Sequence, residues 1–161
     1  EFPVSKIIVA VLLLIIASVL VNRYFTNRKS AAVNSVVGQE YLIENLKNVN
    51  VQTTDSGLQY ETLVQGDGTV HPKATDKVTV HYHGTLIDGT VFDSSVERGQ
   101  TISFGLNQVI KGWTEGVQLM VVGDKTRFYI PSKLGYGTQA AGKIPAGSVL
   151  IFEAELFGIN E

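Results

Sequence analysis

The residues from Val78 to Trp113 include most of the side chains that could form a functional site. They offer aromatic and aliphatic groups, one carboxylate and a few hydroxyls, with almost no obvious nucleophile or general base. Hydrolysis and group transfer need such groups, so this set is poorly suited to them. It suits a reaction that needs a dry, shaped cavity, such as rotation about an amide bond. The candidate side chains are Tyr82, Phe92, Asp93, Phe104, Val109, Ile110 and Trp113.

Two histidines, His81 and His83, lie two residues apart in the same stretch. Side chains two apart on a strand face the same way, and this spacing can hold a metal ion. No third ligand accompanies the pair, so ordinary strand histidines are favoured, and we expect no metal and no cofactor. Ser94 and Ser95 follow Asp93, but the Gly-x-Ser-x-Gly motif of many hydrolases is missing.

Composition excludes several other kinds of site. The chain has 161 residues, with 13 Lys and Arg, 15 Asp and Glu and a formal net charge of −2, so no basic excess points to nucleic acid. It has no cysteine, which excludes disulfides, thiolate zinc sites and cysteine nucleophiles. Its 16 glycines fit a turn-rich β-fold.

The site residues need a sheet to position them, and alternating apolar residues predict one within residues 55–161. Asp88-Gly89 is typical of a hairpin turn. One helix cannot cover both faces of such a sheet, so the sheet must curl around the helix, which gives an α+β fold. The expected strands are Leu58–Val64, Lys77–Tyr82, Thr90–Phe92, Gln100–Gly105, Asp124–Ile130 and Val149–Phe157, and the expected helix is Val109–Met120.

Residues 1–25 form a hydrophobic N-terminal segment. Its uncharged run Ile7–Val21 would be roughly 22 Å long as a helix, at ~1.5 Å per residue. A bilayer core is about 30 Å thick, but Lys6 and Arg23 can extend toward the head groups, and two aromatic residues follow Arg23 at the expected interface. An uncleaved membrane anchor is therefore favoured, with a signal peptide and a buried core helix as open alternatives.

Residues 26–54 are expected to join this segment to the sheet domain. Thr26–Ser35 is mostly polar and small, which is typical of a linker. Apolar residues at positions 42, 43 and 46 predict a short amphipathic helix over 38–48 that docks on the following domain. Because no candidate site residue precedes Tyr82, we expect residues 55–161 to fold and function without the N-terminal helix.

Four motifs follow one another between Gly57 and Ile159: VTVHYHGTLIDGTVFDSS, NQVIKGWTEGVQLM, FYIPSKLGYG and IPAGSVLIFEAELFGI. In this order they resemble the motifs of FKBP-type peptidyl-prolyl cis-trans isomerases. The lead-in EYLIENLKNVNVQTTDSGLQY and the phrase RGQTISFGLNQVI are most similar to the bacterial macrophage-infectivity-potentiator branch of that family.

The resemblance implies a curled antiparallel half-barrel of five to six strands wrapped around one short helix, here preceded by the N-terminal hydrophobic helix. It implies rotation of X-Pro bonds in proline-containing polypeptides, which assists protein folding, by a monomeric catalytic domain. It also implies binding of macrolides such as tacrolimus and rapamycin. The alternative function is a module that binds proline motifs or macrolides, with incidental isomerase activity.

The same resemblance implies individual roles. Trp113 would form the pocket floor beneath the proline ring. Asp93 would either polarise the rotating bond or orient Tyr82 as a scaffold, and the scaffold is favoured. For Phe104, core packing and a site role are equally favoured. The implied catalytic residues are Tyr82, Phe92, Asp93, Trp113, Tyr136 and Phe152, and the implied substrate-binding residues are Phe104, Val109, Ile110 and Ile144.

Three features depart from the family pattern. The loop from Tyr136 to Ile144 lacks the histidine of the small eukaryotic members, which is expected to weaken macrolide binding at the rim. Gln108 stands where those members have glutamate. The long N-terminal helical dimerisation domain of the infectivity-potentiator proteins is expected to be absent, with the anchor in its place.

The favoured location is the bacterial inner membrane, crossed once, with the catalytic domain in the periplasm. Positive charges after the apolar run, at Arg23, Arg28 and Lys29, would by themselves keep the C-terminus in the cytoplasm. The resemblance to exported bacterial proteins points to the periplasm and outweighs this charge count.

Overall fold

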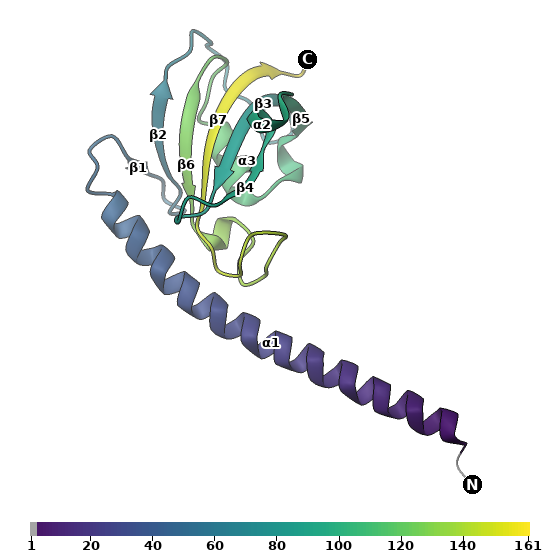
Figure 1. Cartoon of the computed structure of the whole chain (residues 1–161). Helices are drawn as coiled ribbons and strands as arrows, with labels where there is room; N and C mark the ends of the chain where they lie inside the picture. Colours follow the sequence, from purple (N-terminus) through teal and green to yellow (C-terminus); the bar gives the residue numbers. More distant parts are fainter. Residues whose placement is uncertain (1–2) are drawn as a thin grey trace.

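The computed structural model describes residues 3–161 and contains a curled sheet, a short helix against it and a long N-terminal helix (Figure 1). The long helix extends far beyond the sheet domain, and only its C-terminal part lies beside that domain. In chain order the elements are α1 (Val4–Asn45), β1 (Gln52–Thr53), β2 (Gln59–Val64), β3 (Lys77–Thr85), β4 (Val91–Ser94), α2 (Ser95–Arg98), β5 (Ile102–Gly105), η1 (Leu106–Gln108), α3 (Lys111–Val117), β6 (Lys125–Ile130), η2 (Ser132–Leu134) and β7 (Leu150–Ile159).

The sheet has the strand order β1-β2-β6-β7-β3-β4, and β5 also pairs with β3. All neighbouring pairs are antiparallel. β4 pairs with the end of β3 near Thr85 and β5 with the end near Lys77, so the two short strands share one edge of β3. This arrangement confirms the expected curled antiparallel half-barrel around one short helix, with β1 as an additional two-residue edge strand.

The core lies between the concave face of the sheet and α3. On β3, Val78, Val80 and Tyr82 are buried, whereas the residues between them are only half-buried on the outer face. This alternation follows from the pleat of the strand, which sends successive side chains to opposite faces. From α3, Trp113 and Val117 fill the concave side and join the same buried cluster. The periodicity of the sequence therefore predicts the core correctly.

The expected linker at Thr26–Ser35 is wrong, because these residues are helical and continue α1 without a break. The separate helix expected over 38–48 is the end of the same helix, which ends at Asn45. Residues 26–35 contain neither proline nor glycine, so nothing in them interrupts the helical hydrogen bonds. Small polar residues are common in linkers, but they also occur where a helix packs closely on its neighbour. Composition alone does not separate the two cases.

The C-terminal part of α1 docks on the sheet domain as expected. Of the three apolar residues expected to form the docking face, at positions 42, 43 and 46, only one is buried. Leu42 is buried in a second cluster with Tyr129 and Val149, whereas Ile43 and Leu46 are exposed. The Gln59 amide donates a hydrogen bond to the Leu42 carbonyl at 2.9 Å. The helix end is therefore fixed by both apolar packing and hydrogen bonding.

The N-terminal part of α1 has no contact that buries it. Every residue of the run Ile7–Val21 is exposed around the full circumference of the helix. Within residues 3–161, α1 is the one helix long and apolar enough to cross a membrane, although signal sequences share these properties. None of the side chains of this run packs against the described domain, as a buried core helix within residues 3–161 would require.

We expect Leu42→Ala to destabilise the protein by about 2–4 kcal/mol, because it leaves a cavity in the cluster that joins α1 to the sheet. Ile43→Ala is the matched control, since Ile43 is the next residue and is exposed, and it should change the free energy of unfolding by less than about 0.5 kcal/mol. Urea unfolding of a version that begins at Thr26 measures both. Equal effects of the two substitutions would contradict the docking of α1.

Candidate functional site

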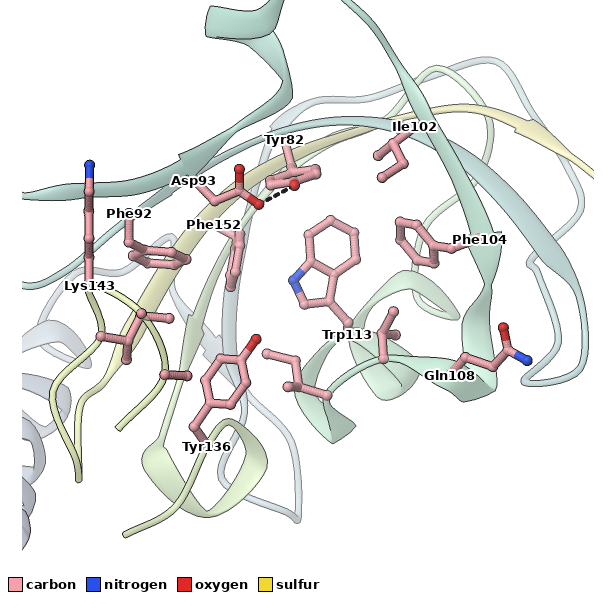
Figure 2. Close-up of a pocket in the computed structure, with 15 residues that line it drawn as sticks. Tyr82, Phe92, Asp93, Ile102, Phe104, Gln108, Trp113, Tyr136, Lys143 and Phe152 are labelled. Atoms are coloured by element: carbon pink, nitrogen blue, oxygen red, sulfur yellow. Dashed lines mark hydrogen bonds between the residues drawn. The ribbon is translucent and has the colours of Figure 1, made fainter. Parts of the chain in front are cut away.

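A cavity of about 670 Å³ opens on the concave side of the sheet beside α3. It brings together all ten residues expected to form the site, from four strands, one helix and two loops (Figure 2). These residues are Tyr82, Phe92, Asp93, Phe104, Val109, Ile110, Trp113, Tyr136, Ile144 and Phe152. Their roles are a separate matter, but their position around a single cavity agrees with the sequence-based expectation.

The floor and walls of the cavity are aromatic. Trp113 is 5 % exposed, and its ring centroid lies 5.2 Å from that of Phe152 and 5.6 Å from those of Tyr82 and Phe104. All three contacts are edge-to-face, the arrangement that the charge distribution of aromatic rings favours. Phe92 packs on Phe152 in the same way at 5.3 Å. Each ring limits the rotation of its neighbours, so the shape of the cavity is largely pre-formed.

The position of Trp113 is set by the first turn of α3. The carbonyl of Ile110 accepts hydrogen bonds from the N–H groups of Trp113 and Thr114. The Thr114 hydroxyl donates to the Leu106 carbonyl at 2.7 Å, which ties the helix to the preceding turn. Within residues 3–161 the Ile110 N–H has no hydrogen-bond acceptor. This N–H, at the rim of the cavity, is available to an external carbonyl.

Both carboxylate oxygens of Asp93 are engaged. Oδ2 accepts the hydroxyl hydrogen of Tyr82, and Oδ1 pairs with the guanidinium of Arg98. Arg98 also donates to the Tyr82 hydroxyl oxygen at 3.1 Å and lies over the Tyr82 ring, 5.8 Å from its centroid. The three side chains form a closed network at one wall of the cavity, and Asp93 is already neutralised by its partners.

This network shifts two ionisation equilibria. Burial raises the pKa of Tyr82, and the hydrogen bond to Asp93 raises it further. Burial also raises the pKa of Asp93, but the hydrogen bonds from Tyr82 and Arg98 together lower it, and the net pKa is below the ordinary value for aspartate. At neutral pH, Tyr82 therefore stays protonated and Asp93 stays ionised. Neither group is suited to transfer a proton under these conditions.

Arg98 was not expected in the site, although the sequence carries a signal for its position. Ser94 caps α2, and its hydroxyl oxygen accepts the N–H of Glu97 at 3.1 Å. Ser-x-x-Glu is the sequence pattern of a capped helix start, and Gly99 ends the helix in a left-handed conformation. One turn of helix between Ser94 and Gly99 brings Arg98 back to Asp93.

The loop between η2 and β7 supplies a second wall. Figure 2 shows the Tyr136 side chain with its hydroxyl directed toward the middle of the cavity. Tyr136 is 44 % exposed, whereas Ile144 from the same loop is buried. Five lining residues were not among the expected site residues: Ile102, Gln108, Ala141, Gly142 and Lys143. Ile102 could have been found from sequence, because it is two residues from Phe104 on the same strand and faces the same way.

His81 and His83 lie on the outer face of the sheet, away from the cavity. Their Nδ1 atoms are each 2.8 Å from a serine hydroxyl, His81 from Ser95 and His83 from Ser94. No group of three or more potential metal ligands occurs in residues 3–161. The pairing of each ring with a serine is consistent with the expected role as ordinary strand histidines.

The comparison with known families decides where the chain belongs. Residues 68–157 match the FKBP-type peptidyl-prolyl cis-trans isomerase family. The chain belongs to this family. The matched range includes all ten expected cavity residues, from Tyr82 to Phe152.

Individual relatives support the same assignment and its narrower branch. The chain is 57 % identical to FkpA of Aeromonas hydrophila over 133 residues, which are 83 % of this chain and 49 % of that protein. It is 44 % identical to the macrophage infectivity potentiator of Trypanosoma cruzi over 126 residues, 78 % of this chain and 64 % of that one. The crystal structure of FkpA from Escherichia coli superposes with a TM-score of 0.87 at 40 % identity, covering 95 % of this chain and 71 % of that chain. The chain thus spans about half the length of several curated FKBP relatives that it matches.

One expectation about the N-terminal region needs correction. Residues 17–62 match the domain that lies amino-terminal to FKBP-type isomerases, so the chain contains part of the sequence pattern that was expected to be absent. The match begins within the apolar run and continues through α1. The anchor was expected in place of this domain, but the apolar run and the matched helical residues belong to one continuous helix, α1.

We expect Asp93→Ala to lower kcat/KM for an X-Pro peptide by about 10-fold and Asp93→Asn by about threefold, because the asparagine carbonyl still accepts the Tyr82 hydroxyl. Glu97→Ala serves as the control, since it removes a nearby carboxylate that forms no hydrogen bond or ion pair within residues 3–161. Protease-coupled peptide isomerisation gives the rates. Complete loss of activity in both Asp93 variants would instead indicate an essential carboxylate.

Proposed function

We propose that the protein catalyses cis-trans isomerisation of X-Pro bonds in polypeptides and thereby assists protein folding. The observation that carries this proposal is the gathering of the expected aromatic and aliphatic side chains around one cavity whose single carboxylate is already paired. Such a cavity offers shape and exclusion of water, and it lacks an activated nucleophile. Rotation of an amide bond needs shape and exclusion of water, but it needs no nucleophile.

The mechanism would act through the environment of the bond. The barrier to X-Pro rotation is near 20 kcal/mol, because the amide C–N bond is partly double. A planar amide carries more charge separation than a twisted one and is better solvated by water. Transfer into an apolar cavity therefore raises the free energy of the planar state relative to the twisted transition state. No covalent step and no cofactor is required.

Each wall would have its own part in this process. The proline ring would lie on the Trp113 indole, and the ring edges of Tyr82, Phe92 and Phe152 would face the carbonyl of the rotating bond. Ring edges carry partial positive charge and tolerate a carbonyl oxygen without a full hydrogen bond. Asp93 would act as a scaffold that holds Tyr82, because it has no proton to remove from this substrate.

The substrate chain on either side of the bond would be held by hydrogen bonds at the rim. The Tyr136 hydroxyl is directed into the cavity, and Ile110, whose N–H has no acceptor in the described chain, lines it, so both would donate to substrate carbonyls. Phe104, Val109 and Ile144 would supply the apolar surface between them. These contacts fix the peptide while the bond turns, which is the positioning part of catalysis.

We expect full-length protein in detergent to accelerate isomerisation of an Ala-Pro or Leu-Pro peptide above the rate in buffer, and we expect tacrolimus to inhibit it with the same concentration dependence as it changes fluorescence. Trp113 is the one tryptophan in the chain, so its emission reports on the cavity. Folded protein with saturable tacrolimus binding and no acceleration would favour the alternative, a binding module. Tacrolimus binding that leaves activity unimpaired would show that the macrolide site and the isomerase site are different.

We also propose that residues 7–21 anchor the protein in the bacterial inner membrane with the isomerase domain in the periplasm. The run is uncharged and unburied, and the helix that contains it is longer than a bilayer requires. Bacterial relatives of the FkpA type support a bacterial setting. Protease accessibility in spheroplasts distinguishes the two orientations.

We expect full-length protein to fractionate with membranes, and Leu13→Lys to shift it toward the soluble fraction, because a charge at the centre of the run costs about 3 kcal/mol. Val33→Lys is the matched control: Val33 is exposed on the same helix but lies beyond the run, and this variant should stay with membranes. Intact protein recovered without detergent would contradict an anchor. A mature N-terminus downstream of Val21 would identify a signal peptide.

A further inference from the structure

One face of α1 lies against the loop that forms the second wall of the cavity. Ala31, Asn34, Gly38 and Leu42 recur at intervals of three and four residues, so they share one side of the helix. Ala31, Gly38 and Leu42 are buried and Asn34 is half-buried, whereas the residues on either side of this stripe are mostly exposed. The stripe therefore marks a packed surface within the segment that resembles a linker by composition.

The contacts of this face are unusually close. The side-chain amide of Asn34 donates a hydrogen bond to the Ala146 carbonyl at 2.8 Å. A Cβ atom on Gly147 would lie 2.4 Å from the Ala31 carbonyl oxygen, so backbone touches backbone at this point. A Cβ atom on Gly38 would lie 2.7 Å from Val149 Cγ2. Larger side chains at these glycines would separate the helix from the loop.

The loop contacted by α1 connects directly to the cavity. The Gly147 N–H donates to the Gly137 carbonyl, and the Gly137 N–H donates to the Ser132 carbonyl, both at 2.8 Å. Tyr136 immediately precedes Gly137, and Ile144 lies three residues before Gly147. Only two residues of the loop, Ala141 and Ile144, form a β-bridge, and they pair with each other rather than with the sheet. The segment 145–149, docked on α1, is therefore one attachment of this loop to the remainder of the protein, beside the burial of Ile144 in the main core cluster.

We propose that Asn34, supported by Ala31 and Gly38, is a positioning residue of the isomerase. By holding residues 145–149 of the loop, α1 keeps Tyr136 and Ile144 in place before substrate binds. Pre-ordering a loop lowers the entropy that binding must otherwise overcome. The inference rests on the proposed use of this cavity as the isomerase site. Residues 55–161 alone are still expected to fold and to accelerate isomerisation, but with a raised KM.

The test uses full-length protein in detergent with Asn34→Asp and Asn34→Ala. Asp has the same shape as Asn but presents an oxygen to the Ala146 carbonyl, and Ala removes the donor without adding charge. Ser35→Asp and Ser35→Ala are matched controls, because Ser35 is the next residue and is exposed. Peptide isomerisation gives kcat and KM, and hydrogen exchange gives the protection of residues 137–147 and of β3.

We expect KM to rise about fivefold in both Asn34 variants with kcat changed less than about twofold, because a loop that must order on binding weakens ground-state and transition-state binding alike. Exchange in 137–147 should accelerate about fivefold while β3 keeps its protection. The Ser35 variants should match the unaltered protein in both measurements.

Several outcomes would overturn the proposal. Unchanged KM and loop exchange in both Asn34 variants would show that the contact does not position the loop. Raised KM without faster loop exchange, or exchange that accelerates equally in β3, would assign Asn34 to another role or to general stability. Absence of activity in the unaltered protein would refute the proposed function instead. The exchange data would still show whether the contact between Asn34 and Ala146 orders the loop.

Discussion

A curled antiparallel sheet gains stability only if its concave face is covered, and here a helix of seven residues provides that cover. The remaining concave surface becomes the cavity. Tyr82, Trp113 and Phe152 belong at once to the buried core and to the cavity wall. The packing that stabilises the fold therefore also holds the site rigid, and a substitution at these positions affects both stability and function.

An apolar cavity is useful for amide rotation only if its few polar groups do not bring water with them. Asp93 partly meets this condition: Tyr82 and Arg98 bind its oxygens, while the outer side of the pair stays exposed to solvent. In the described chain, no buried side-chain nitrogen or oxygen lacks a hydrogen-bond partner. The site thus presents mostly ring faces, ring edges and methyl groups to a ligand.

Strand positions, the core and the membership of the cavity could be predicted from sequence, because they follow from alternation and from four motifs in order. Arg98 was missed because the one-turn helix that carries it is indicated only by its cap, Ser94 with Glu97. The role of Thr26–Ser35 was missed for a different reason. Residues such as Ala31 and Asn34 are small or polar in both linkers and close helix contacts, and only the partner surface distinguishes the two.

Under the proposed membrane anchor, the continuity of α1 would also limit where the isomerase domain can work. From Val21 to Asn34, a helix at ~1.5 Å per residue spans about 20 Å, and the loop contact holds the domain at that distance. A flexible linker would let the domain sweep a hemisphere around its attachment point. With residues 7–21 in lipid, as proposed, a rigid helix would confine it instead to a thin layer parallel to the bilayer. Encounters would then favour chains that fold close to the membrane surface, where both partners diffuse in two dimensions.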